Sequence, residues 1–180
     1  MRLFIALALP ADIIHNLEQL LDTLRPTARI SWVQPANLHI TLKFIGEWPD
    51  PRVPELASAL TQVPVRGPIR LAVRDLGFFP NPRSPRVFWV GVDAPGLAEL
   101  AAAIDRATAT LGIDSEKRAF SPHLTLARIK DRLNLKPLED GIAALPSRDF
   151  GSFEARAFHL YRSQLRPTGA IYTPLQSFPL

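Results

Sequence analysis

The sequence predicts an α+β fold, in which strands and helices are mixed without the steady alternation of a parallel βαβ protein. Three observations lead to this prediction. Several short runs of the 180-residue chain are apolar or alternate between apolar and polar residues, as strands do. Two longer segments carry apolar residues at helical spacing, and strand-like runs often follow one another directly. We expect a single domain over residues 1–180, since this length can bury one sizeable core.

In the first half of the chain, an apolar strand is expected at residues 2–9, where the run "RLFIALAL" is followed by Pro10. A helix should follow and continue until Pro26, because leucine and isoleucine recur at helical spacing in between. The other elements expected in this half are strands at 30–33 and 38–45 and a short helix at 53–63.

In the second half, alternation at 69–79 predicts a strand, and "RVFWVGV" at 86–92 predicts another after a proline-rich turn. A second long helix is expected at 95–111, since Gly112 just past its end is a typical stop signal. The remaining expected elements are a strand at 122–129, a short helix at 133–144, a long strand region at 152–165 and a final strand at 171–178. Three aromatic side chains on the strands are assigned to the core: Trp32, Phe44 and Trp89.

The composition is that of an ordinary globular protein, with 47% hydrophobic and 21% charged residues. The absence of cysteine excludes disulfides, thiolate nucleophiles and zinc–thiolate sites. The formal net charge of +4 is compatible with a polyanionic partner such as RNA. No apolar run approaches the roughly 20 residues that span a bilayer, and the N-terminal run lacks a cleavage site. We therefore expect a cytoplasmic protein that does not bind membranes.

Each half of the chain carries the same pattern at the start of a predicted strand, "HITL" from His39 and "HLTL" from His123. Each half also contains strands and one long helix, so the chain has a weak internal repeat. Successive side chains of a strand point to opposite faces, which places Thr41 beside His39 and Thr125 beside His123. One copy is typical of any amphipathic strand, but two copies in related lobes predict a shared site where they converge.

Two histidines suit a reaction that removes one proton and delivers another near neutral pH, because an unperturbed imidazole titrates near about 6.5. Two threonine hydroxyls are hydrogen-bond donors that suit an anionic centre between them. A phosphodiester fits both requirements: one imidazole takes a proton from an attacking water, and the other protonates the departing ribose oxygen. A strained cyclic phosphate needs no metal ion for this departure. The residues themselves do not distinguish the two histidines.

The two tetrapeptides lie within a series of five segments that resembles the 2H phosphoesterase superfamily. The segments are, in order, "MRLFIAL", "PANLHITLKFIGE", "SPHLTLARI", "FHLYRSQL" and "YTPLQSFPL". Within the superfamily the sequence is similar to the bacterial and archaeal RNA 2′,3′-cyclic phosphodiesterases, also called the 2′-5′ RNA ligase family. The resemblance extends over nearly the whole chain, and the duplicated histidine motif is its most specific part.

The resemblance implies a bilobed fold, in which two pseudo-symmetric lobes line a central groove with antiparallel sheets and carry helices outside. It also implies metal-independent hydrolysis of RNA 2′,3′-cyclic phosphodiester ends to 2′-phosphomonoesters, with no cofactor. By matching position, His39 is expected to be the proton donor, His123 the proton acceptor, and Thr41 and Thr125 ligands of the phosphate. The expected partner is RNA or a nucleotide with a 2′,3′-cyclic phosphate, and the protein is expected to be a monomer.

Two basic residues near the motifs are further candidates for substrate binding. If alternation is regular, Lys43 shares the strand face of His39 and could contact an RNA phosphate at the groove edge. Arg128 follows the second motif and lies by alternation on the face opposite Thr125. The resemblance, through the shared "LAR" ending, implies a place for Arg128 near the phosphate, while an arginine in solvent or in a salt bridge is an equal alternative.

Three alternatives to hydrolysis differ in how well the residues support them. Ligation through a 2′-5′ linkage would use the same groove with a ribose hydroxyl in place of water, although the high concentration of water favours hydrolysis. A nucleotide- or RNA-binding module would keep the groove without turnover, but binding alone does not need two titrating imidazoles. A metalloenzyme is disfavoured, since four histidines, no cysteine and no acidic residue at a recognisable spacing leave few ligands.

Overall fold

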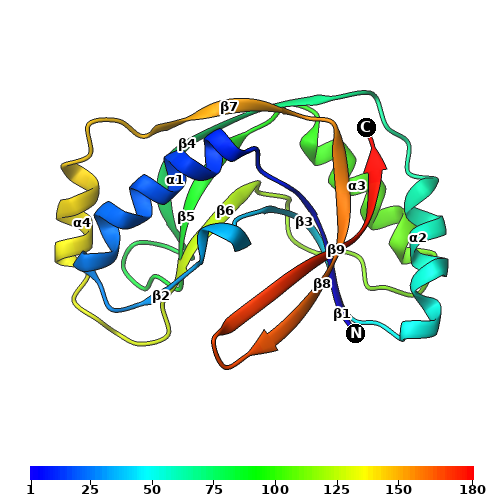
Figure 1. Cartoon of the computed structure of the whole chain (residues 1–180), viewed down its shortest axis with the longest axis horizontal. Helices are drawn as coiled ribbons and strands as arrows, with labels where there is room; N and C mark the ends of the chain where they lie inside the picture. The colour runs from blue at the N-terminus through cyan, green and yellow to red at the C-terminus, as the bar shows by residue number, and fades with distance from the viewer.

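Two antiparallel sheets form the centre of the computed structural model, which describes residues 1–180 (Figure 1). One sheet has four strands in the order β3-β1-β8-β9, and the other has five in the order β2-β6-β5-β4-β7. The strands are β1 (Arg2–Leu7), β2 (Ser31–Trp32), β3 (Ile40–Glu47), β4 (Ile69–Phe79), β5 (Val87–Asp93), β6 (His123–Arg128), β7 (Asp149–Ala155), β8 (Ala157–Arg166) and β9 (Gly169–Pro179). Each sheet therefore combines strands from both halves of the chain.

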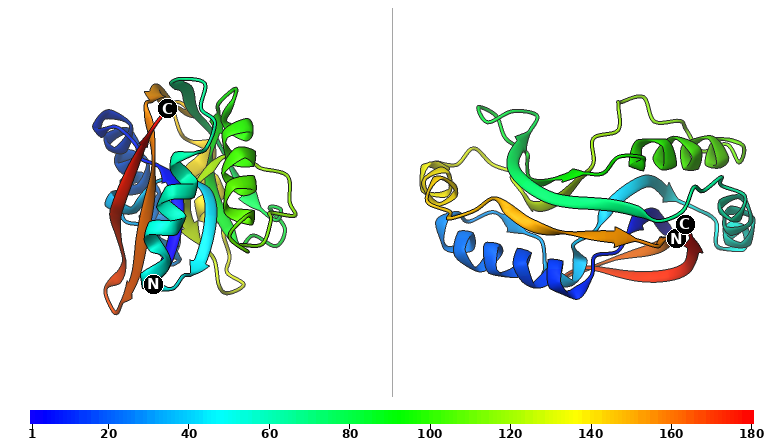
Figure 2. Two further views of the ribbon diagram at one scale, coloured as in Figure 1. Left: turned by 90° about the vertical axis from the view of Figure 1, so that its right-hand side faces the viewer. Right: turned by 90° about the horizontal axis from the view of Figure 1, so that it is seen from above.

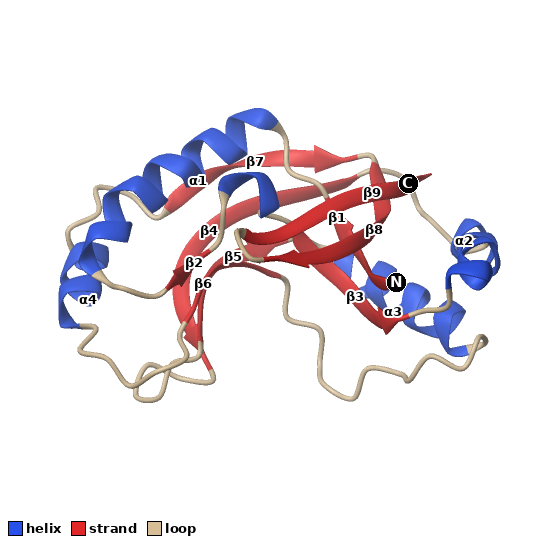
Figure 3. Ribbon diagram, turned by 60° about the horizontal axis from the view of Figure 1, so that its bottom comes forward, coloured by secondary structure: helices blue, strands red, loops and turns tan.

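Four α-helices lie at the two ends of the molecule, outside the curved sheets (Figures 1 and 3). They are α1 (Ala11–Leu24), α2 (Val53–Thr61), α3 (Leu97–Ala109) and α4 (Lys136–Ala143), and short 3₁₀-helices occupy Arg25–Thr27, Pro35–Asn37 and Asp50–Arg52. Helix α1 packs against β7 and α4, whereas α3 packs against β3 and α2. Seen from above, α1 and α3 lie on opposite sides of the molecule (Figure 2). Helix α1, from the first half of the chain, thus packs on the five-stranded sheet, which contains the second histidine motif. Helix α3, from the second half, packs on the four-stranded sheet, which contains the first motif.

The first long helix forms where apolar residues recur every three or four positions. Its buried residues make one stripe that faces the sheet: Ile13, Leu17, Leu20, Leu21 and Leu24. Asp12 lies in the first turn, where its negative charge interacts favourably with the helix dipole. Pro26 lacks a backbone N–H and follows the last helical turn, which matches the predicted end. None of the four helices is both long and apolar enough to cross a membrane.

The predicted α+β class is confirmed, with two lobes built on antiparallel sheets, and one strand prediction needs correction. Residues 152–165, expected as one strand region, belong to β7 and β8, which lie in different sheets and separate at Arg156. Strand β7 pairs with β4, whereas β8 pairs with β1 and β9. The chain therefore crosses between the sheets at this point. Buried apolar residues of both sheets form one contiguous core.

Candidate active site

The two histidine motifs lie on strands that contact each other across the two sheets. Strand β3 begins directly after His39, and β6 begins at His123. The predicted alternation is confirmed over the first residues of both motifs, because Thr41 and Thr125 are partly exposed while the apolar residues on either side of them are buried. The apolar face packs on the core, so the opposite face of each strand presents an imidazole beside a hydroxyl.

Each motif strand contains a β-bulge just after the threonine. In β3, consecutive residues of β1 pair with Thr41 and Lys43, so the residue between them is extra. In β6, consecutive residues of β5 pair with Thr125 and Ala127, so again one residue is extra. A bulge moves the residues that follow it to the opposite face. The internal repeat therefore includes the backbone irregularity as well as the histidine and threonine.

The bulge in β3 makes the prediction for Lys43 wrong, because this residue does not share the groove face of His39 and Thr41. Its side chain is 4% exposed, and its Nζ lies 2.5 Å from the Asp105 carboxylate on α3. Nζ also donates a hydrogen bond of 2.6 Å to the backbone carbonyl of Asp114. Lys43 therefore links the first motif strand to the second half of the chain and is absent from the groove lining.

The same bulges bring Phe44 and Arg128 onto the groove face, whereas regular alternation predicts the opposite face for both residues. Phe44, assigned to the core, is 60% exposed and lines the groove. Arg128, expected on the face opposite Thr125, lines the groove together with Thr125. Regular alternation fails at both residues because one extra residue precedes each of them. Arg128 therefore lies in the groove with Thr125, where the strand pattern does not place it.

Backbone carbonyls fix the orientation of both imidazoles. The Nδ1 atoms of His39 and His123 each lie 2.7 Å from the carbonyl oxygen two residues earlier, of Asn37 and Ser121 respectively. A carbonyl only accepts, so Nδ1 carries the proton in both rings. Nε2 is then the atom that accepts a proton in the neutral ring and donates it in the charged ring. The Asn37 side chain is itself held by a 2.8 Å hydrogen bond to the carbonyl of Ala170.

An open cavity of about 620 Å³ brings the two motifs together. Its lining includes both motif histidines, both motif threonines and Arg128. The convergence expected from the internal repeat is therefore confirmed. The protein contains no group of three or more His, Cys, Asp or Glu side chains that could hold a metal ion.

Aromatic rings surround both imidazoles, and the sequence pattern did not identify them as site residues. The ring centroids of Phe4 and Tyr172 lie 4.9 Å and 5.2 Å from that of His39. Phe79 lies 5.0 Å from His123 and nearly perpendicular to it. Phe4 falls in a continuous apolar run without alternation, so its sequence context gives no sign that it faces the groove.

The surroundings of His39 disfavour its charged form. Burial lowers the pKa of His39 below its ordinary value of 6.5, and the nearby charges of Arg128 and His123 lower it further. The hydrogen bond to the Asn37 carbonyl acts in the opposite direction but does not compensate. The His39 imidazole is therefore neutral in the free protein near pH 7. A bound anion between the two rings would favour the protonated form.

Comparisons with known proteins agree with this arrangement. A family model described as LigT like Phosphoesterase matches two successive segments, residues 7–89 and 90–172, each with one histidine motif. A protein of Methanocaldococcus jannaschii named RNA 2′,3′-cyclic phosphodiesterase is 35% identical over 178 residues, which cover 99% of this chain and all of that protein. A protein of Archaeoglobus fulgidus with the same name is 36% identical over 179 residues, which cover 99% of each chain.

Solved structures show the same fold. The protein TT0787 of Thermus thermophilus has a TM-score of 0.84 and 32% identity, covering 100% of this chain and 98% of that one. E. coli LigT complexed with 3′-AMP has a TM-score of 0.80 and 30% identity, covering 99% and 97%. The duplicated fold, with a histidine–threonine pair in each half, defines a two-histidine phosphoesterase. The chain belongs to the LigT-like phosphoesterase family.

Proposed function

We propose that this protein hydrolyses RNA or nucleotide ends that carry a 2′,3′-cyclic phosphate to 2′-phosphomonoesters, without a metal ion. The observation that carries the proposal is the pair of imidazoles whose Nδ1 atoms are held by backbone carbonyls, so that both Nε2 atoms can serve the same groove. The relatives from M. jannaschii and A. fulgidus, at 35% and 36% identity, are named for this activity.

The proposed reaction is one displacement at phosphorus with two proton transfers. Thr41 and Thr125 donate hydrogen bonds to the nonbridging oxygens of the phosphate, and Arg128 offsets the negative charge that builds there. Nε2 of His123 accepts a proton from water as the water oxygen bonds to phosphorus. The bond from phosphorus to the 3′ oxygen breaks, and Nε2–H of His39 donates its proton to that oxygen. Each imidazole contributes about 3 to 5 kcal/mol to lowering the barrier.

The proton-donor role of His39 depends on the electrostatics of the groove. The donor role of His39 requires a charged imidazole, whereas burial, Arg128 and His123 lower its pKa in the free protein. An anionic phosphate bound beside the ring supplies an opposite charge and raises that pKa. His39 therefore gains its proton as the substrate binds, and the donor is competent in the complex. In the complex, His123 also faces the bound phosphate, and the hydroxyls of Thr41 and Thr125 donate hydrogen bonds to it.

The position of cleavage tests the proposed reaction. The protein is incubated with an oligonucleotide that ends in a 2′,3′-cyclic phosphate, with EDTA present, and the product is identified by phosphorus NMR. We expect a 2′-phosphate at an undiminished rate, because the leaving group is the 3′ oxygen. Formation of the 3′-phosphate would reverse the assignment of the leaving oxygen, and loss of the reaction in EDTA would contradict metal independence.

A substrate with sulfur in place of the bridging 3′ oxygen separates the two histidine roles. A thiolate departs without being protonated, so this substrate does not need the proton donor. We expect His39→Ala to lose much less activity with the sulfur substrate than with the oxygen substrate. His123→Ala should be impaired equally with both, because activation of water is still required. The opposite pattern would exchange the roles of the two residues.

A further inference from the structure

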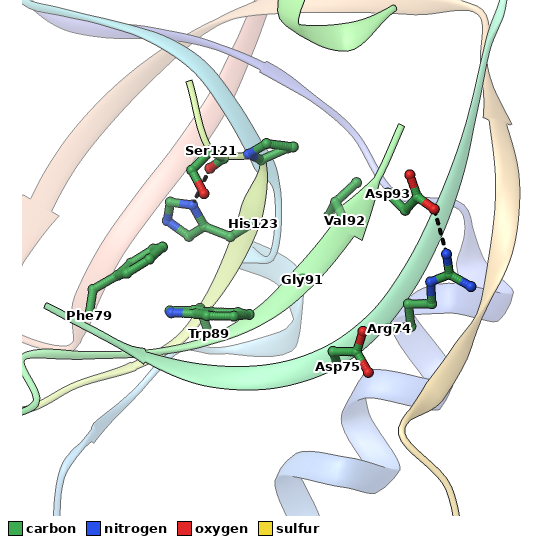
Figure 4. A pocket seen from close by; sticks show the side chains of 10 residues that line it. Arg74, Asp75, Phe79, Trp89, Gly91, Val92, Asp93, Ser121 and His123 are labelled. Carbon is green, nitrogen blue, oxygen red and sulfur yellow. Dashed lines mark hydrogen bonds and ion pairs between the residues drawn. The ribbon is translucent and has the colours of Figure 1, made fainter. Parts of the chain in front are cut away.

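A second cavity, of about 400 Å³, lies directly beyond His123 on the concave face of the five-stranded sheet (Figure 4). His123 lines this cavity as well as the groove, so the two spaces adjoin at the imidazole. Trp89 from β5 and Phe79 and Asp75 from β4 contribute to its wall. Its volume is within the range of small-molecule sites, and a group bound here would lie next to a phosphate held at His123.

Trp89 lies flat on the sheet, and Gly77 on the neighbouring strand makes this possible. A Cβ atom on Gly77 would lie 2.2 Å from Cζ2 of the indole, whereas one on Gly91 would meet the Arg74 carbonyl oxygen at 2.7 Å and the indole only at an ordinary contact distance. The core position predicted for Trp89 is therefore wrong, because the ring covers the concave face and lines the cavity below His123 (Figure 4). Aromatic rings that lie on an open sheet face are the usual platform on which RNA-binding proteins stack bases.

Asp75 is one of the polar residues that line the cavity. Its φ of 68° is unusual for a residue with a side chain, and it falls at the irregularity between β4 and β5. The neighbouring Arg74 pairs with Asp93, which leaves the exposed Asp75 carboxylate available at the cavity wall (Figure 4). A carboxylate repels a phosphate and only accepts hydrogen bonds. It therefore suits the edge of a base better than the RNA backbone.

We propose that this cavity binds the nucleobase of the nucleotide that carries the cyclic phosphate, with Trp89 stacking on the base and Asp75 accepting hydrogen bonds from it. This inference rests on the proposed function. Guanine is the base that fits best, because its N1–H and 2-amino groups are two adjacent donors for one carboxylate. Adenine and cytosine place an acceptor beside their amino group, and uracil places a carbonyl on each side of its N–H.

The test compares substrates with and without a base. The substrates are guanosine and uridine 2′,3′-cyclic phosphates and methyl riboside 2′,3′-cyclic phosphate, which has no base. We expect the wild type to prefer guanosine over uridine in kcat/KM by about tenfold, the value of one bidentate base contact. Asp75→Asn should remove this preference. Trp89→Leu should lower kcat/KM for both nucleotides by about tenfold, the value of one stacked base, while Trp89→Phe retains most of it.

All of these variants should hydrolyse methyl riboside 2′,3′-cyclic phosphate as the wild type does, which shows that the fold and the histidines are intact. Asp12→Asn, on the outer helix α1, is the matched control and should change nothing. An unchanged guanosine preference in Asp75→Asn, or equal losses with and without the base, would overturn the base cavity. If the wild type hydrolyses none of the three, the proposed function fails instead. Calorimetric binding of guanosine 2′-phosphate to wild type and Asp75→Asn then still tests the cavity.

Discussion

Phe44 and Arg128 occupy the same position in the two halves of the protein, and both side chains face the groove. Each follows a bulge of the same kind, so the two halves share their backbone but differ in the chemistry of this one position. The first half presents an aromatic ring and the second a guanidinium. Burial is the main cause of the lowered pKa of His39, and the Arg128 cation lowers it further across the groove.

Replacement of the cation tests its action on substrate and on His39. For Arg128→Gln we expect KM for a 2′,3′-cyclic nucleotide to rise roughly tenfold, the value of one hydrogen bond to a charged group. The pKa of His39 should rise toward 6.5, because one positive charge that disfavours the imidazolium is removed. Steady-state kinetics and NMR titration of the imidazole measure the two effects. Arg106→Gln on α3 is the control, and an unchanged KM and pKa would refute the placement of Arg128.

Lys43 is expected to contribute to stability and not to substrate binding. Burial disfavours ionisation of Asp105, but hydrogen bonds from Lys43 and the Glu116 backbone outweigh this and lower the pKa of that carboxyl. In Lys43→Met the carboxylate loses its ion pair and the Asp114 carbonyl loses its donor. We expect a loss of about 2 kcal/mol in the free energy of unfolding, below the usual value for a fully buried pair because Asp105 retains contact with water.

Urea unfolding and the KM for RNA distinguish this role from the groove-edge contact predicted by regular alternation. The matched control is Lys136→Met, which breaks an exposed ion pair with Asp140 and should leave the free energy of unfolding nearly unchanged. A stable Lys43→Met protein whose KM for RNA has risen would contradict the structural role. A destabilised protein with unchanged KM would support it.

The lowered pKa of His39 also predicts how stability depends on pH. Burial is the main cause of the shift, so the unfolded chain binds a proton near pH 6.5 while the folded chain binds it only at lower pH. In that interval the unfolded state holds more protons, and the free energy of unfolding falls as the pH falls. His39→Gln should remove this contribution. Urea unfolding from about pH 7 to about pH 5 should therefore show a shallower slope for the variant, and parallel curves would contradict the shift.

The duplicated histidine and threonine could be predicted from the sequence, because regular alternation holds over the first residues of each motif. The faces of Lys43, Phe44 and Arg128 could not. One extra residue in each strand reverses the pattern, and that residue is a leucine in both cases, which fits a regular strand equally well. Only the pairing with the neighbouring strand reveals the bulge.

The cavity beyond His123 is likewise a product of tertiary packing. An apolar strand with a tryptophan predicts a core position, whereas the Trp89 ring lies on the concave face, where Gly77 of the neighbouring strand makes room for it. The strand pattern of the sequence does not predict the crossover at Arg156 either, again because the crossover depends on tertiary packing. The strand pattern continues through this residue, and the change of partner from β4 to β1 depends on where distant strands lie.

The central claim is that His39 and His123 together carry out the chemistry at one phosphate. Its most direct measurement is the single-turnover rate of an oligonucleotide 2′,3′-cyclic phosphate, in EDTA, for the wild type, His39→Ala and His123→Ala at saturating protein. We predict that each variant is slower by about 10²- to 10⁴-fold, the range for positioned acid–base catalysis, with an unchanged melting temperature. A folded variant of either histidine that turns over the substrate at the wild-type rate would contradict the account.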